Sequence, residues 1–117
     1  MGYHEVVEMY YATKGQVFQI SVTFSNSGSK PWTEMTAIGQ ATEDRLGAQN
    51  PQDNATWGFN RVQIDAGETI LPGASKTFTF NCTAPNVAGL YNLQWKMLRE
   101  GVEWFGALST NVQVTVV

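Results

Sequence analysis

The stretch of residues 17–26 reads VFQISVTFSN and decides the fold class. Apolar side chains occupy every second position, and Gln19, Ser21 and Thr23 stand between them. This period of two is typical of a β-strand with one face buried and the other in solvent. We therefore predict a half-buried strand, whose inward-facing side chains are Phe18, Ile20, Val22 and Phe24.

The same alternation recurs in three later stretches, residues 77–83, 90–98 and 112–116. Each places apolar side chains at one parity and polar side chains at the other, so each is predicted to be a half-buried strand. Cys82 shares its parity with two phenylalanines and is expected to be a small core residue. The side chains assigned to the core from these patterns are Trp95, Tyr91, Phe78, Phe80 and Cys82.

Turn-forming residues separate these strands. Pairs such as Pro72-Gly73 and Glu100-Gly101 offer the fixed or positive φ that a chain reversal needs. The second pair is typical of the two-residue loop of a tight hairpin. We expect this hairpin to join the last two strands of the chain.

The predicted number of strands is about seven when three weaker candidates, residues 5–12, 34–41 and 61–64, are included. No stretch shows the 3.6-residue period of an amphipathic helix. Strands with one apolar face and no helix to cover it bury that face against another sheet. The sequence therefore predicts a single all-β domain over residues 1–117, an immunoglobulin-like antiparallel β-sandwich.

Composition excludes several classes of protein. The chain has 117 residues, a formal net charge of −3 and 43% hydrophobic residues, which suits one folded domain rather than a disordered chain. Its seven Lys and Arg residues are scattered singly, which argues against nucleic-acid binding. With one cysteine and one histidine, neither an internal disulfide nor a structural zinc site is expected, and no cofactor is predicted. No apolar run is long enough to span a membrane.

Three segments resemble a known family. They are residues 46–62, LGAQNPQDNATWGFNRV, residues 91–97, YNLQWKM, and residues 100–106, EGVEWFG. These segments resemble the four-tryptophan (FW) domain, the immunoglobulin-like domain of the selective-autophagy receptor encoded next to the first breast-cancer susceptibility gene, and its bacterial relatives. The resemblance covers roughly residues 15–117. The four tryptophans are Trp32, Trp57, Trp95 and Trp104.

The resemblance implies a β-sandwich without catalytic activity. In the autophagy receptor the domain is implicated in contacts with partner and cargo proteins, and the bacterial relatives resemble accessory modules of exported hydrolases and surface proteins. The expected function is therefore a protein-interaction module within a larger protein. The alternatives are a carbohydrate-binding accessory module and a structural spacer. An extracellular or cell-surface location follows from the same resemblance.

Trp57 has two interpretations. No periodic apolar neighbours assign it to the core, so its ring is a candidate platform for a peptide or a sugar. In the alternative, Trp57 folds back and holds its own loop, while residues 50–54 satisfy backbone groups as in Asx turns. Arg61 would then pair with Asp53 and be structural.

Trp104 is the second aromatic candidate. An unbroken register over residues 102–116 would place it on the buried face with Val112 and Val114, whereas a bulge at Gly106 would reverse that assignment. The hypothesis is that aromatic and loop residues outside the regular strands form a binding surface. The candidate binding residues are Trp57, Trp104, Glu103, Asn54 and Arg61.

Residues suited to catalysis or metal binding are scarce. His4 has no nucleophile motif around it. Asp53 and Glu103 would be the acid and base of a glycosidase, but ten acidic residues in one small domain supply such pairs by accident. Asp44, Asp53 and Asp65 lack the close spacing of a calcium loop. The sequence therefore predicts neither an enzyme nor a metal site.

Two strands are expected at sheet edges, residues 5–12 and the final strand that ends at residue 117. An unpaired strand edge readily pairs with another strand. Self-association through these two edges is therefore predicted.

Overall fold

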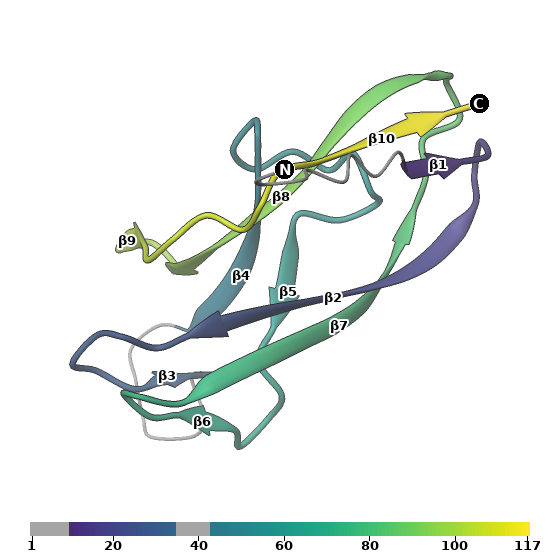
Figure 1. Ribbon diagram of the computed structural model, residues 1–117. Coiled ribbons are helices and arrows are strands. Elements are labelled where there is room, and N and C mark those ends of the chain that lie inside the picture. The colour runs from purple at the N-terminus through teal and green to yellow at the C-terminus, as the bar shows by residue number, and fades with distance from the viewer. Residues whose placement is uncertain (1–9, 35–42) are drawn as a thin grey trace, which may run out of the picture.

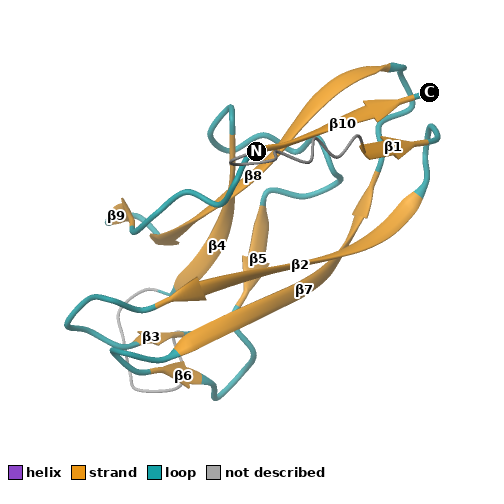
Figure 2. Ribbon diagram, viewed as in Figure 1, coloured by secondary structure: helices purple, strands orange, loops and turns teal. Residues whose placement is uncertain are grey.

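The protein was analysed as a computed structural model that describes residues 10–34 and 43–117 (Figure 1). Every regular element in these ranges is a β-strand, which confirms the all-β prediction (Figure 2). Among the described residues, no helix is long and apolar enough to cross a membrane. The strands are β1 (Tyr10–Ala12), β2 (Val17–Ser25), β3 (Trp32–Thr33), β4 (Asp44–Gln49), β5 (Arg61–Gln63), β6 (Thr69–Ile70), β7 (Ser75–Thr83), β8 (Gly89–Arg99), β9 (Glu103–Phe105) and β10 (Val112–Val116).

The larger sheet is built around β8. Its strand order is β1-β10-β8-β4-β5, and β9 also pairs with β8. Leu93 of β8 lies opposite Val112 of β10, and Met97 of β8 lies opposite Phe105 of β9. β4 pairs with one edge of β8. β10 and β9 pair with the opposite edge, one after the other along the strand. Residues 106–111 interrupt this edge.

The second layer is the long ladder of β2 and β7, which pair through nine residues each. Their inner faces are apolar, and their outer faces are polar, as the alternation predicts. Cross-strand hydroxyl pairs join the outer face, for example Ser21 and Thr79 at 2.8 Å and Thr23 and Thr77 at 2.8 Å. A short ladder of β3 and β6 lies next to one end of this layer (Figure 1).

Trp95 lies at the centre of the core between the layers. Its side chain is 0% exposed. The ring of Phe59 stacks on it at 5.7 Å, and the ring of Phe80 meets it edge-on at 5.1 Å. Such aromatic pairs add about 0.5–1.5 kcal/mol each beyond the area that they bury. Among the residues assigned to the core from sequence, Phe78, Cys82 and Trp95 are at most 2% exposed, and Phe80 and Tyr91 are partly buried against them.

Cys82 is a fully buried thiol within this core. Burial raises the pKa of the Cys82 thiol to about 12, because the apolar surroundings disfavour the thiolate. The thiol is therefore protonated at neutral pH and behaves as a small apolar side chain.

Strand count and edges differ from the sequence-based expectation. The described residues contain ten strands rather than about seven. β3, β6 and β9 were not predicted, because strands of two or three residues are too short to show an alternating pattern. β4 was missed, since its residues do not alternate in polarity. The final strand is not an edge, because β10 lies between β1 and β8. Of the predicted strands at 5–12 and 34–41, residues 5–9 and 35–41 fall outside the described residues, and Glu34 is not in a strand.

The predicted two-residue hairpin is also corrected. Arg99 pairs with Glu103, so the loop between β8 and β9 has three residues, 100–102. The Val102 N–H donates to the Arg99 carbonyl at 3.0 Å, and Gly101 has a φ of 71°. A positive φ at this position is what a type II turn requires, and glycine adopts it without strain. The hairpin joins β8 to the short β9 and not to the final strand.

Candidate functional site

Trp104 lies on the outer face of the larger sheet. It is directly opposite Leu98 of β8, and β4 continues the same surface through Gly47. The neighbouring Phe105 points the other way and packs against Trp32, with ring centroids 5.8 Å apart. Because residues 106–111 interrupt the edge strand, the register is broken there, and Trp104 does not share the face of the buried β10 valines.

Gly47 permits this position of the indole. A Cβ at Gly47 would lie 2.5 Å from Cη2 of Trp104 and 2.9 Å from Cδ2 of Leu98. These distances are too short for any side chain at position 47, so the ring of Trp104 lies directly over the glycine. Trp104 is half-buried as a result.

Replacement of Gly47 by alanine is expected to push the Trp104 ring off the sheet. We expect a loss of about 1–3 kcal/mol in the free energy of unfolding, as for other overpacked sites. Urea denaturation would measure it. Gly89→Ala is the matched control, because a Cβ there meets Tyr91 at an ordinary 3.5 Å. Equal midpoints for both variants would contradict the packing argument.

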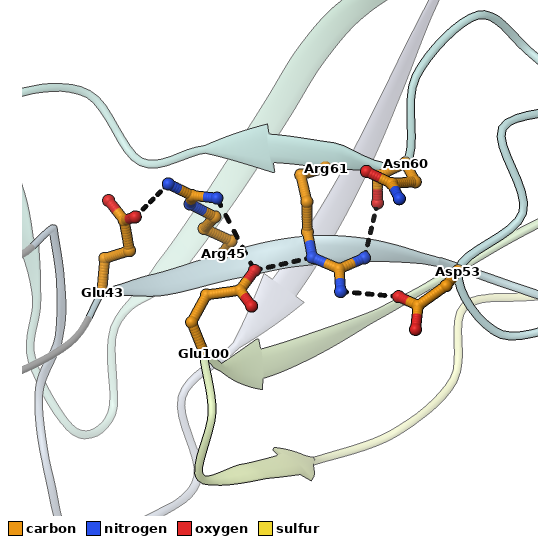
Figure 3. A network of polar contacts seen from close by, with 6 residues as sticks. All are labelled: Glu43, Arg45, Asp53, Asn60, Arg61 and Glu100. Atoms are coloured by element: carbon orange, nitrogen blue, oxygen red, sulfur yellow. Dashed lines mark hydrogen bonds and ion pairs between the residues drawn. The ribbon is translucent and has the colours of Figure 1, made fainter.

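Arg61 of β5 lies next to Trp104 and is bound by two carboxylates (Figure 3). Its Nε donates to Glu100 Oε1 at 2.6 Å, and its Nη2 lies 2.6 Å from Asp53 Oδ1. The guanidinium carbon also lies 5.1 Å from the centroid of Trp104, which is a cation–π distance. Burial acts to lower the pKa of Arg61, but hydrogen bonds and charge from Glu100 and Asp53 outweigh it, so the pKa is raised.

Glu100 links this arginine to a second one. Its Oε1 lies 3.7 Å from Nη1 of Arg45, and Arg45 also binds Glu43 (Figure 3). The network joins β4, β5, the loop before β5 and the β8–β9 turn, which are distant in sequence. Arg61 is therefore fixed by carboxylates from two other segments, and Arg45 by the nearby Glu43 and by Glu100, so the surface around Trp104 is preorganised.

Trp57 lies in the core and not on the surface. Its side chain is 2% exposed, and its Nε1 donates to the Asn92 carbonyl at 3.0 Å. Phe18 and Tyr91 meet its ring edge-on at 5.6 and 6.2 Å. This placement corresponds to the interpretation in which Trp57 folds back, and it removes the ring as a stacking platform because no ring face is open to a ligand.

Asn54 builds the loop before Trp57. Its Nδ2 donates to the carbonyls of Gln49 at 3.0 Å and Pro51 at 2.6 Å, and its Oδ1 accepts from the Thr56 N–H at 3.2 Å. The last bond is that of an Asx turn. Asn54 therefore stabilises its own loop, because these three bonds join residues at most five positions away.

Glu103 lines two hollows, the shallow one beside Trp104 and a groove between the layers. The groove has a volume of about 940 Å³. One wall is β2 together with the loop that follows it, and the other wall is β9 together with the segment before β10. Phe24, Trp32 and Phe105 contribute aromatic surface to it.

The carboxylates considered for metal binding are each held by a different cation. Asp44 accepts two hydrogen bonds from Arg99, at 2.8 and 3.1 Å. Asp53 binds Arg61, and Asp65 lies 3.3 Å from Lys76. Within residues 10–34 and 43–117, no three side chains of the metal-binding types gather together.

The five predicted binding residues therefore do not form one site. Trp104 lies with Arg61 on the outer face, and Glu103 shares the hollow beside Trp104 and also lines the groove. Asn54 lies in its loop and Trp57 in the core. Gly47, Arg45 and Glu100 were not predicted for this surface. A glycine inside a strand is a recognised sign of a close approach, and this signal would have pointed to Gly47.

Comparison with known proteins places the chain in a family. No protein of the curated set matches it. The family described as the Ig-like domain from next to BRCA1 gene matches residues 6–116. The match covers nearly the whole chain and agrees with the resemblance in the three segments and with the all-β structure. The protein belongs to this family of Ig-like domains.

Proposed function

We propose that this domain is a non-catalytic protein-interaction module that binds its partner through the outer face around Trp104. Membership of an Ig-like family supports an interaction role in general terms. The observation that carries the choice of surface is the half-buried Trp104, held between Gly47 and the guanidinium of Arg61. Tryptophan and arginine are the residues most enriched at the energetic centres of protein interfaces.

Two further features favour this surface. Val102 is 64% exposed and lines a shallow hollow, whose other lining residues are Leu98, Arg99, Gly101, Glu103 and Trp104. Apolar surface is therefore open to a partner beside the tryptophan. The ion-pair network fixes Arg61 in advance, so little side-chain entropy remains to be lost on binding.

Site-specific photocrosslinking in the cell of origin tests the proposal. A benzoylphenylalanine at Val102 is expected to form discrete adducts with a partner protein, and one at Leu71, which is 61% exposed, is not. Excess unlabelled domain should compete for the adduct, whereas excess Val102→Glu domain should not. Absence of adducts at position 102 would favour the spacer alternative and overturn the proposal.

The carbohydrate alternative makes a different prediction. It requires a free aromatic ring, but Trp57 is buried and Trp104 is already in contact with Arg61. A glycan array with the labelled domain is therefore expected to remain silent. Glycan binding that disappears in Trp104→Ala, with the domain still folded by circular dichroism, would assign the surface to sugars and contradict the protein-binding proposal.

A further inference from the structure

The second layer of the sandwich has a long strand edge without a strand partner in the described part of the chain. β2 pairs with β7 through all nine of its residues, and no other strand of residues 10–34 and 43–117 pairs with it. Alternate backbone N–H and C=O groups of β2 therefore point away from β7. Such an edge is a template for another extended chain.

The groove shows that there is space beside the last four residues of this edge. Val22, Thr23, Phe24 and Ser25 are consecutive, and all four line the groove. Successive side chains of a strand point to opposite faces. A hollow that touches four in a row therefore follows the backbone edge and not one face of the strand.

β2 also lacks the usual protection of an edge. Natural edge strands are commonly blocked by charged residues, proline or bulges. None of the nine β2 residues is charged, and none is proline. By contrast, β7 carries Lys76, and the Thr83 N–H at its end already donates to the Trp57 carbonyl at 3.0 Å. Of the two long strands, β2 is therefore the one open to pairing.

The residues of β2 are complementary to a second copy of β2. In an antiparallel pairing centred on Ser21, directly opposed side chains lie on the same face of the sheet. Apolar inner residues then meet apolar residues, and no charges are opposed although the chain carries a net charge of −3. The opposed pairs are Phe18 with Phe24, Ile20 with Val22, Gln19 with Thr23, Val17 with Ser25 and Ser21 with Ser21 of the second copy.

This register is the one that uses the whole strand. A shift by one residue would set inner positions against outer positions. A shift by two residues keeps the faces but leaves part of each strand unpaired. In the centred register the hydroxyl groups on the outer face continue across the dimer. Ser21 Oγ lies 2.8 Å from Thr79 Oγ1 in each copy, and the two Ser21 side chains would face each other.

We propose that two copies of this domain associate by antiparallel pairing of β2 about a two-fold axis at Ser21. The result is a continuous four-stranded sheet with the order β7-β2-β2-β7. A two-fold interface of this kind is self-complementary and closed, so it yields a dimer and not a fibre. The β2 edge is separate from the outer face around Trp104. A result that contradicts the dimer therefore does not contradict the proposed function, and the reverse also holds.

Cysteine crosslinking of the 117-residue chain tests the register. Opposed Cα atoms in an antiparallel pair are about 4.5–5.5 Å apart, within disulfide range. We therefore expect Ser21→Cys to form a covalent dimer on mild oxidation. Gln19→Cys is the matched control, since two copies of position 19 would be offset by roughly 13 Å along the strands. A mixture of Gln19→Cys and Thr23→Cys should crosslink again. The native Cys82 is fully buried and is not expected to take part.

Sedimentation equilibrium provides the second measurement. The unmodified chain is expected to show a concentration-dependent dimer. Ser21→Lys should abolish the dimer, because two like charges would be directly opposed. Thr79→Lys, on the adjacent position of β7, should retain it. Both positions are exposed, so both variants should unfold at nearly the same urea concentration as the parent.

Two outcomes would overturn the proposal. The first is a monomer at millimolar concentration. The second is crosslinking of Gln19→Cys alone at the rate of Ser21→Cys, which would indicate random collision.

Discussion

Replacing Arg99 with methionine is expected to lower the free energy of unfolding by about 3 kcal/mol, at the lower end of the range for breaking a buried ion pair. Asp44 is 0% exposed and is bound by Arg99 through both carboxylate oxygens. The hydrogen bonding that Arg99 donates to Asp44 is the main reason that the pKa of Arg99 is raised. Without Arg99, the buried carboxylate retains the Thr33 N–H as a donor, at 3.0 Å. Urea denaturation would measure the loss.

Two further variants make this prediction specific. Asp44→Asn in the Arg99→Met background should recover part of the lost stability, because a neutral amide is cheaper to bury than a carboxylate. Lys76→Met removes the pairs with Asp65 and Glu68, whose side chains are 83% and 35% exposed, and should cost less than about 1 kcal/mol. If the double variant were less stable than Arg99→Met, the buried charge would not be the cause.

Replacing Trp57 with alanine is expected to cost about 3–5 kcal/mol, as for other large aromatic residues removed from a core. The loss has two sources. Phe18 and Tyr91 lose the ring against which they pack, and the Asn92 carbonyl loses its indole donor. Because Trp57 connects the loop before β5 to both layers, we also expect proteolysis to begin in this loop.

Val102→Ala provides the contrast for Trp57. Its side chain is 64% exposed, so the change in unfolding free energy should stay within about 0.5 kcal/mol. Trp57→Phe should fall between the two, since it keeps part of the packing but not the hydrogen bond. A Trp57→Ala variant with the stability of the parent chain would show that the ring is not part of the core, and the exposed-platform interpretation would have to be restored.

The regular part of the fold could be predicted from sequence because its signal is local. The alternation in β2, β7, β8 and β10 identifies four strands and the inward parity of Phe78 and Trp95, and both side chains are buried. A resemblance in three segments also indicated the family that matches residues 6–116. Both inferences need only neighbouring residues, since a strand repeats every second position.

The candidate site was harder to predict because its contacts join distant segments. β4 lacks a clear polarity pattern, since the charged Asp44 is buried at the same parity as Leu46, and Gly47 lies on the other face under Trp104. Arg61 and Glu100 are 39 positions apart in sequence. They meet because β4 pairs with both β5 and β8 and so brings Arg61 close to the turn that follows β8. No periodicity reports such a pair. Of the predicted site, Trp104 was brought together with Arg61 and, at the shallow hollow, with Glu103, and the pairing of Arg61 with Asp53 was foreseen as an alternative.

The amino-acid sequence alone determined that this chain forms strands, which of their faces turn inward and to which family it belongs. Only the tertiary structure decided the position of the two candidate binding tryptophans. Trp57 is buried because Phe18 and Tyr91 pack on its ring, and the Asn92 carbonyl, 35 residues away, accepts its N–H. Trp104 is on the outer face because residues 106–111 break the register of the last edge. Alternation is a property of neighbours along the chain, whereas burial of an isolated ring depends on which distant strands close over it.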